Sequence, residues 1–89
     1  MTWRWRINNY LICNLLGACY YDRKTIYINH RIHRLYRLPL LDTCIHKDLH
    51  RVFPRAERDI EALTDDILAL LTPRDRRLLT ARYRTKLGI

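Results

Sequence analysis

The spacing of the hydrophobic residues changes near Asn29, and no other feature of the sequence restricts the fold as strongly. Before Asn29, Trp3, Trp5 and Ile7 alternate with polar residues, as on one face of a half-buried strand. After Asn29, apolar residues recur at steps of three and four, which is the spacing of helices that bury one side. Strands and helices in separate parts of a chain are typical of α+β folds and disfavour an alternating βαβ fold.

Residues 1–29 are expected to form an antiparallel β-meander of three or four short strands. The first strand should begin almost at the first residue, and a second apolar run covers residues 10–16 before Gly17 interrupts it. The clearest hairpin pairs Cys19–Tyr21 with Thr25–Tyr27 across a short polar turn. The two tryptophans of the first strand are expected to lie in the core.

Residues 30–89 are expected to form three or four helices. Pro39 and Pro54 bound the first two, because proline ends or interrupts a helix. A third helix is expected over residues 55–71, and a fourth over residues 73–88, which follow a threonine cap and begin with proline. The apolar stripe predicted for the third helix consists of Ile60, Leu63, Ile67, Leu70 and Leu71.

Size and composition limit where such a chain can act. Eighty-nine residues have room for one hydrophobic core, so residues 1–89 are expected to be a single domain. The three cysteines lack CxxC spacing and follow no cleavable signal, which favours a reducing, cytoplasmic location. No run approaches the roughly 20 apolar residues that cross a bilayer, so no membrane partner is expected.

The charge of the chain is strongly positive but uneven. Lys and Arg number 17 against 9 Asp and Glu, a formal net charge of +8, and residues 57–72 alone are acidic. Such a charge favours an acidic partner, which could be a nucleic acid, another protein or the acidic helix of a second copy. The arginines expected to make these contacts are Arg31, Arg34, Arg37, Arg74, Arg77 and Arg84.

Two histidines and a glutamate have the spacing of a metal site. His46 and His50 lie four residues apart, so on a helix they share one face, turned away from the centre of the core. Glu57 follows just beyond Pro54, on the inward side of the next helix. Two histidines and one carboxylate are the three protein ligands that a catalytic zinc ion commonly takes.

A purely structural interpretation remains open for these residues. Histidines paired in this way also arise by chance, and they then form local hydrogen bonds or lie in solvent. His30 and His33 stand among arginines, which favours a solvated basic face over a ligand role.

Three segments together suggest a family. The hairpin strand Thr25-Ile26-Tyr27-Ile28 precedes Leu41-Asp42-Thr43-Cys44-Ile45-His46-Lys47-Asp48-Leu49-His50, and Phe53-Pro54 precedes Glu57. This order resembles the small zinc metallopeptidases of bacteriophages, in which a K-x-I-x-I strand leads to L-D-T-x-I-H-E-x-x-H and then F/L-P-x-x-x-E. The resemblance covers about residues 15–71. It implies a minimal zincin-like fold with zinc held by His46, His50 and Glu57.

One position departs from the family pattern. The glutamate that follows the first histidine serves in the family as the general base, and here this position is Lys47. A lysine ammonium cannot accept a proton, and its charge opposes a metal ion nearby. Asp48 cannot take over the role, because on a helix it points towards the apolar side.

Three functions are compatible with this sequence. The first is a degenerate zincin-like phage protein that retains the metal site and binds another protein in the host cytoplasm or in the virion. The second is an active zinc-dependent peptidase or other hydrolase with a different base. The third is a basic nucleic-acid-binding protein, in which basic residues would contact phosphates and nearby Tyr and Trp rings would stack on a single strand. Besides the arginines named above, these basic residues are Arg4, Arg6, Arg23, Lys24 and those of the helix from Arg74 to Lys86.

Overall fold

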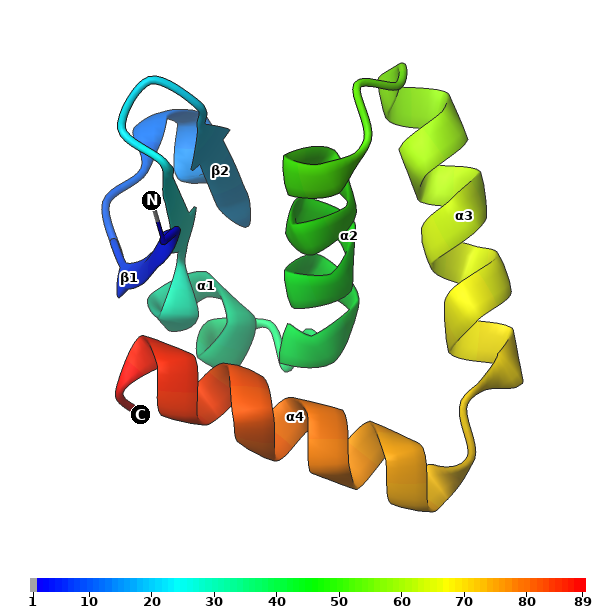
Figure 1. Ribbon diagram of the computed structural model, residues 1–89. Coiled ribbons are helices and arrows are strands. Elements are labelled where there is room, and N and C mark those ends of the chain that lie inside the picture. The colour runs from blue at the N-terminus through cyan, green and yellow to red at the C-terminus, as the bar shows by residue number, and fades with distance from the viewer. Residues whose placement is uncertain (1) are drawn as a thin grey trace.

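The strands and the helices occupy separate parts of the chain, as the sequence predicts. The structure, a computed structural model, describes residues 2–89. Its elements are β1 (Arg4–Ile7), the 3-10 helix η1 (Ile12–Asn14), β2 (Gly17–Tyr20), β3 (Thr25–Ile28), α1 (His30–Leu35), α2 (Leu40–Val52), α3 (Glu57–Leu70) and α4 (Pro73–Leu87). Figure 1 shows α2 between the sheet and α3, with α4 running beneath them. The expected α+β class is confirmed.

The strand directions differ from the expected antiparallel meander. The strand order is β1-β3-β2, so the central β3 pairs antiparallel with β2 and parallel with β1. The predicted hairpin is confirmed, with Cys19 opposite Ile26 and Tyr20 opposite Thr25. The meander was wrong because alternation of residue types defines which face of a strand is buried, and leaves its neighbour and direction open.

Residues 10–16 form a connection and not the second strand that their apolar composition predicts. Leu11 is buried, but Tyr10 and Ile12 are 84% and 75% exposed. Cys13 and Asn14 adopt positive φ angles of 55° and 52°, which turn the chain. This connection takes the chain from β1 to the opposite edge of the sheet, and the returning β3 therefore runs parallel to β1.

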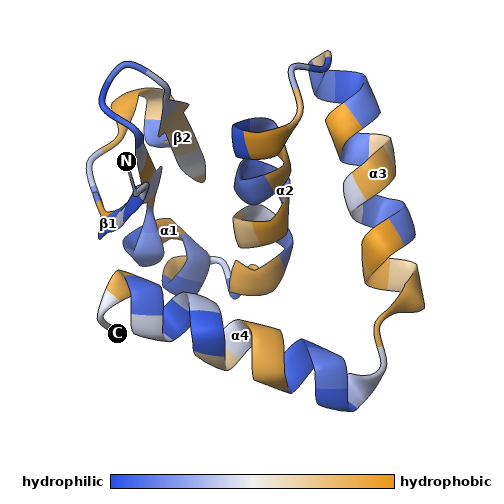
Figure 2. Cartoon of the chain, in the orientation of Figure 1, coloured by the Kyte–Doolittle hydropathy of each residue, from blue (hydrophilic) through white to orange (hydrophobic). Residues whose placement is uncertain are grey.

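Helix α2 carries the main contact between the sheet and the helices. Its residues Leu41, Cys44 and Ile45 are buried with Ile26 and Ile28 of β3. Figure 2 shows hydrophobic and hydrophilic bands along α2 and α3, as expected of helices that bury one side. Within residues 2–89, no helix is both long and apolar enough to span a membrane.

Helix α3 buries a narrower stripe than the sequence predicts. Ile60, Thr64 and Leu68 lie one turn apart and are buried, whereas Leu63 and Leu70 are exposed. The reason is that α3 packs mainly against α2, along one side. A single neighbouring helix covers positions at steps of four and leaves the flanking positions in solvent.

Helix α4 begins and ends where its sequence predicts. The Thr72 side chain accepts a hydrogen bond from the Asp75 amide, and the Asp75 carboxylate accepts one from the Thr72 amide. Gly88 ends the helix at a φ of 74°, a conformation that glycine adopts without strain. Tyr83 and Leu87 of this helix are buried in the core.

His33 is a core residue, which corrects the prediction of a solvated basic face. Its side chain is buried; Nδ1 lies 2.6 Å from the carbonyl oxygen of Asn29 and Nε2 lies 2.7 Å from Oγ1 of Thr43. A carbonyl can only accept, so Nδ1–H donates to Asn29, and Nε2 forms its hydrogen bond with the Thr43 hydroxyl. The bond to Thr43 connects α1 to the start of α2.

The cysteines should differ sharply in reactivity. Cys13 is exposed, whereas Cys44 is fully buried and its burial raises the pKa of the thiol to about 12. Because the thiolate is the reactive form, we expect Cys13 of the folded protein to react with a disulfide reagent at pH 8 and Cys44 to react only after unfolding. Mass spectrometry of the labelled peptides measures the extent of reaction at each cysteine. Rapid labelling of Cys44 in the native protein would contradict its buried position on α2.

Candidate metal centre

The end of α2 and the start of α3 bring the three predicted ligands together. His46 and His50 lie one turn apart on α2, with their Nε2 atoms 3.1 Å from each other. Phe53 ends α2 in an extended conformation next to Pro54, and the chain then reverses into α3, whose first residue is Glu57. This reversal places the Glu57 side chain over the two imidazole rings.

The donor atoms of the triad converge on one another. Oε1 of Glu57 lies 2.6 Å from Nε2 of His46, and Oε2 lies 2.8 Å from Nε2 of His50. One ligand atom from each residue falls within 4.8 Å of the other two. The three predicted residues therefore form a cluster that could hold a metal ion.

The chemistry of this donor set suits a divalent metal ion such as zinc. Two imidazole nitrogens and a carboxylate oxygen are ordinary zinc ligands. With bonds of roughly 2.0–2.2 Å, tetrahedral ligand atoms lie about 3.3 Å apart. The separations here, 2.6, 2.8 and 3.1 Å, are shorter than this, so the side chains would have to rotate apart to open a cation position. The histidine side chains are 16% exposed and that of Glu57 is 61% exposed, which leaves the centre accessible from solvent.

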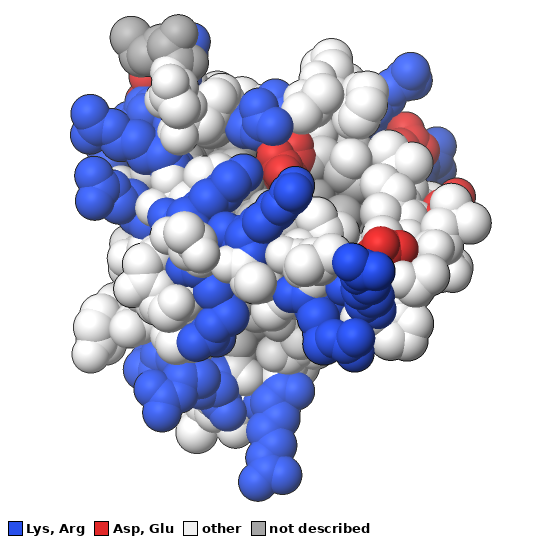
Figure 3. Space-filling model, turned by 60° about the horizontal axis from the view of Figure 1, so that its bottom comes forward, with Lys and Arg blue, Asp and Glu red and all other residues white. Residues whose placement is uncertain are grey.

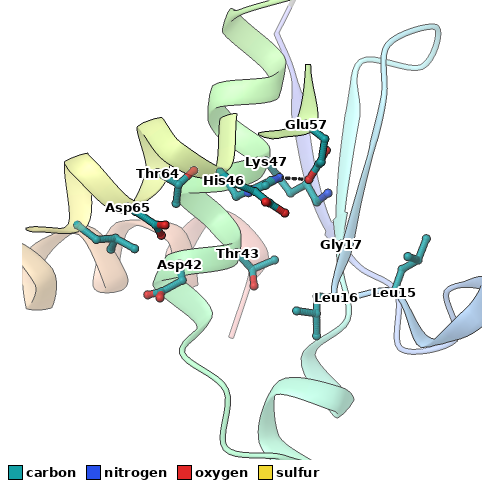
Figure 4. Close-up of a pocket in the computed structure, with 12 residues that line it drawn as sticks. Leu15, Leu16, Gly17, Asp42, Thr43, His46, Lys47, Glu57, Thr64 and Asp65 are labelled. Atoms are coloured by element: carbon teal, nitrogen blue, oxygen red, sulfur yellow. Dashed lines mark hydrogen bonds and ion pairs between the residues drawn. The ribbon is translucent and has the colours of Figure 1, made fainter. Parts of the chain in front are cut away.

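A cavity of about 480 Å³ opens beside the triad, between α2, α3 and the segment that leads into β2. Figure 4 shows His46, Lys47 and Glu57 at one end of this cavity and Asp42 and Asp65 further along it. The lining residues are Leu15, Leu16, Gly17, Asp42, Thr43, His46, Lys47, Glu57, Glu61, Thr64, Asp65 and Leu68.

Lys47 lines the same cavity as His46 and Glu57, and Gly17 allows it to lie close to the sheet. A Cβ atom at Gly17 would fall 3.0 Å from the carbonyl oxygen of Tyr27 and 3.3 Å from Cε of Lys47. A larger residue at this position would therefore require small shifts of the Tyr27 carbonyl in β3 and of the Lys47 side chain. The residue after the first histidine thus faces the cavity, where its ammonium group can donate but not accept hydrogen bonds.

The cavity is acidic, although the chain as a whole is basic. Four of the nine carboxylates of the chain line it: Asp42, Glu57, Glu61 and Asp65. Partial desolvation raises the pKa of Glu57, but the charge and hydrogen bond of His46, with His50 and Lys47 nearby, bring it below its usual value. Glu57 is therefore a carboxylate at neutral pH, which is the form that binds a cation.

Asp48 lies outside the cavity, as its helix position predicts. Its Oδ2 accepts a hydrogen bond from the Tyr83 hydroxyl at 2.8 Å, and its Oδ1 lies 2.8 Å from Nε of Arg51. Burial and this hydrogen bond raise the pKa of Tyr83, so the phenol stays a donor. Asp48 thus links α2 to α4 and cannot serve the triad.

The six predicted partner-binding arginines do not gather at the triad. They lie on or next to α1 and along α4, and all six are exposed. Nε of Arg31 donates to the carbonyl oxygen of Asn9, and its guanidinium lies 5.7 Å from the ring centroid of Tyr10. These contacts hold Arg31 against the loop after β1.

Sequence reasoning missed the acidic residues that line the cavity together with His46. Asp42 lies one turn before His46 on α2, and Glu61 and Asp65 follow Glu57 at steps of four on α3. This spacing was a usable signal, because residues four apart share a helix face. Also missed was Tyr21, whose hydroxyl donates to the carbonyl oxygen of His50 and holds the end of α2 near the β2–β3 turn.

Comparison with known proteins finds no family model, curated protein or solved structure that matches this chain.

Proposed function

We propose that this protein binds one zinc ion through His46, His50 and Glu57 and uses the adjoining cavity to bind another protein without hydrolysing it. The observation that carries the proposal is the convergence of two imidazole nitrogens and a carboxylate at the mouth of a cavity. When bound, zinc would supply a Lewis-acidic centre for an oxygen atom of the partner. The zinc ligands also join α2 to α3, so the ion would hold the cavity in shape.

Lys47 supports binding over hydrolysis. Its side chain lines the cavity beside His46, where the phage metallopeptidases that the sequence resembles carry their general base. The ammonium group cannot take a proton from water, but it can donate a hydrogen bond to a carbonyl or carboxylate of a bound partner. We therefore propose a degenerate zincin-like protein of phage type, acting in the host cytoplasm or on the virion.

One observation favours active hydrolysis as a second candidate. Glu61 lies one turn after Glu57 on α3 and lines the same cavity, so a carboxylate is present there that the family pattern does not require. If Glu61 served as the base, the purified protein would cleave peptides, and Glu61→Gln would abolish cleavage while leaving zinc binding intact.

Metal analysis of the purified, untagged chain tests the proposal. We expect about one zinc per chain, and no cleavage of casein or of a peptide library. Lys47→Glu replaces a positive by a negative charge beside the ligands and should tighten zinc binding by about tenfold. Affinity is measured by competition with a chromophoric chelator.

Lys24→Glu is the matched control for this charge reversal. Lys24 lies just before β3, away from the cavity lining, so its reversal should change zinc affinity by less than about twofold. Absence of zinc from the wild type even after zinc addition would disprove the metal site, and zinc-dependent cleavage would disprove the non-catalytic role.

A further inference from the structure

A second hollow lies along β1 and shares no lining residue with the metal cavity. Its volume is about 800 Å³, and its walls come from three parts of the chain. The N-terminal segment contributes most of them, α2 adds Arg51 and α4 adds Lys86. The β1 groove is lined by Thr2, Trp3, Arg4, Trp5, Arg6, Arg51 and Lys86.

The charged groups of the β1 groove are all positive. Arg4 and Arg6 are exposed, and within residues 2–89 no carboxylate lies within 4.0 Å of either one or of Lys86. Arg51 also lines the groove, but its charge is partly neutralised because its Nε pairs with Asp48. Figure 3 shows Lys and Arg spread over much of the face that includes α4, while most visible acidic side chains lie towards one side. The groove therefore offers three free cations to an anionic ligand.

The two tryptophans of the β1 groove are held in place and only half-buried. Trp5 packs against Tyr83 with ring centroids 5.1 Å apart, and Trp3 meets Tyr21 edge to face at 5.8 Å. Nζ of Lys86 lies 5.5 Å from the centroid of Trp5. Fixed aromatic rings beside free cations are the arrangement that binds bases and phosphates together.

The backbone of β1 adds further polar groups at this place. The amide of Arg4 donates to the carbonyl oxygen of Lys24, and that of Asn8 donates to the carbonyl oxygen of Ile28. The backbone N–H and C=O groups of successive residues point to opposite sides of a strand. Those of Trp5 therefore face the free edge of the sheet, away from β3. Arg4 and Arg6 occupy one face of β1 about 7 Å apart, and Trp3 and Trp5 occupy the other. A nucleic-acid strand along the free edge can therefore place successive phosphates at the arginines and its bases at the tryptophans.

We propose that the β1 groove binds single-stranded nucleic acid. Arg4, Arg6 and Lys86 would contact phosphates, and the half-exposed tryptophan rings would stack on bases. An acidic peptide could use the cations but would leave the aromatic rings without a matching planar group. A duplex keeps its bases stacked inside the helix, where rings set in a groove cannot reach them.

Tryptophan fluorescence reports on this groove directly, because Trp3 and Trp5 are the only tryptophans of the chain. We expect an oligodeoxythymidine of about 20 nucleotides to quench the fluorescence at low salt. With three phosphate contacts, log K should fall against log salt concentration with a slope of about −2. Quenching should persist in excess chelator, which separates this proposal from the metal site.

Arg4→Ala/Arg6→Ala tests the assignment, and Arg74→Ala/Arg77→Ala is the matched control on α4. We expect the first variant to bind at least about tenfold more weakly, and its slope of log K against log salt concentration to become shallower by about 1.4. The control should change affinity by less than about threefold. Lys86→Ala should weaken binding in the same direction. Circular dichroism checks the fold of each variant.

Three outcomes would overturn the proposal. The first is an equal loss of affinity in both double variants, which would mean diffuse attraction to the whole basic surface. The second is quenching by polyglutamate as strong as by the oligonucleotide, which would assign the groove to acidic proteins. The third is the absence of quenching by the oligonucleotide at low salt.

Discussion

Replacing both His46 and His50 by alanine should lower the zinc affinity by more than about 100-fold. The change removes two of the three donor atoms, and loss of groups that only support metal ligands already costs about 10- to 100-fold. Glu57 alone, 61% exposed, would remain as a weak monodentate or bidentate site. Chelator competition and metal content per chain measure the loss.

The fold should survive this double change in the absence of zinc. Leu41, Cys44 and Ile45 pack α2 against the sheet on another face of the helix, and neither histidine belongs to the core. Bound zinc should raise the free energy of unfolding of the wild type by about 2.7 kcal/mol at a free concentration 100 times the dissociation constant, and that of the variant by less than about 0.4 kcal/mol.

His30→Ala provides the control for histidine removal, because His30 lies on α1 and belongs to neither the triad nor its cavity. It should bind zinc like the wild type. Equal zinc content in the double variant and in this control would show that the ion is held elsewhere, and would refute the assignment.

Truncating Ile26 to alanine should destabilise the protein by about 3 to 4 kcal/mol. Ile26 is fully buried in β3, the central strand, where the sheet meets α2 and α4. Removing its outer carbons loses the transfer free energy and leaves a cavity that the rigid surroundings cannot close. In a domain of this size such a loss is a large part of the total stability.

Urea unfolding followed by circular dichroism measures the effect, which should appear as a fall in midpoint of about 2 M without a change in slope. Leu70→Ala is the matched control, because Leu70 is 82% exposed near the end of α3 and its truncation should cost less than about 0.5 kcal/mol. A shift of equal size in the two variants would mean that the sheet is not the centre of the core.

Much of the local structure could be predicted because it depends on neighbours in the sequence. Prolines and caps fixed the ends of α2 and α4 within a few residues, and the i, i+4 spacing of His46 and His50 put them on one face. Side-chain burial was less predictable. His33 looked like part of a basic surface. Asn29, four residues earlier at the start of α1, binds one of its nitrogens locally, but Thr43 of α2, which binds the other, is brought to it only by the fold.

The sequence by itself therefore determined the order and type of the elements and the alignment of two ligands on one helix, because helical periodicity and proline act over a few residues. Only the tertiary structure decided that β1 pairs parallel with β3, that Glu57 closes over the two histidines, and that the N-terminal strand and the ends of α2 and α4 enclose a basic groove. These features depend on how whole elements pack against one another, and burial of residues such as Ile26 and Ile28 favours one packing in a way that no local pattern encodes.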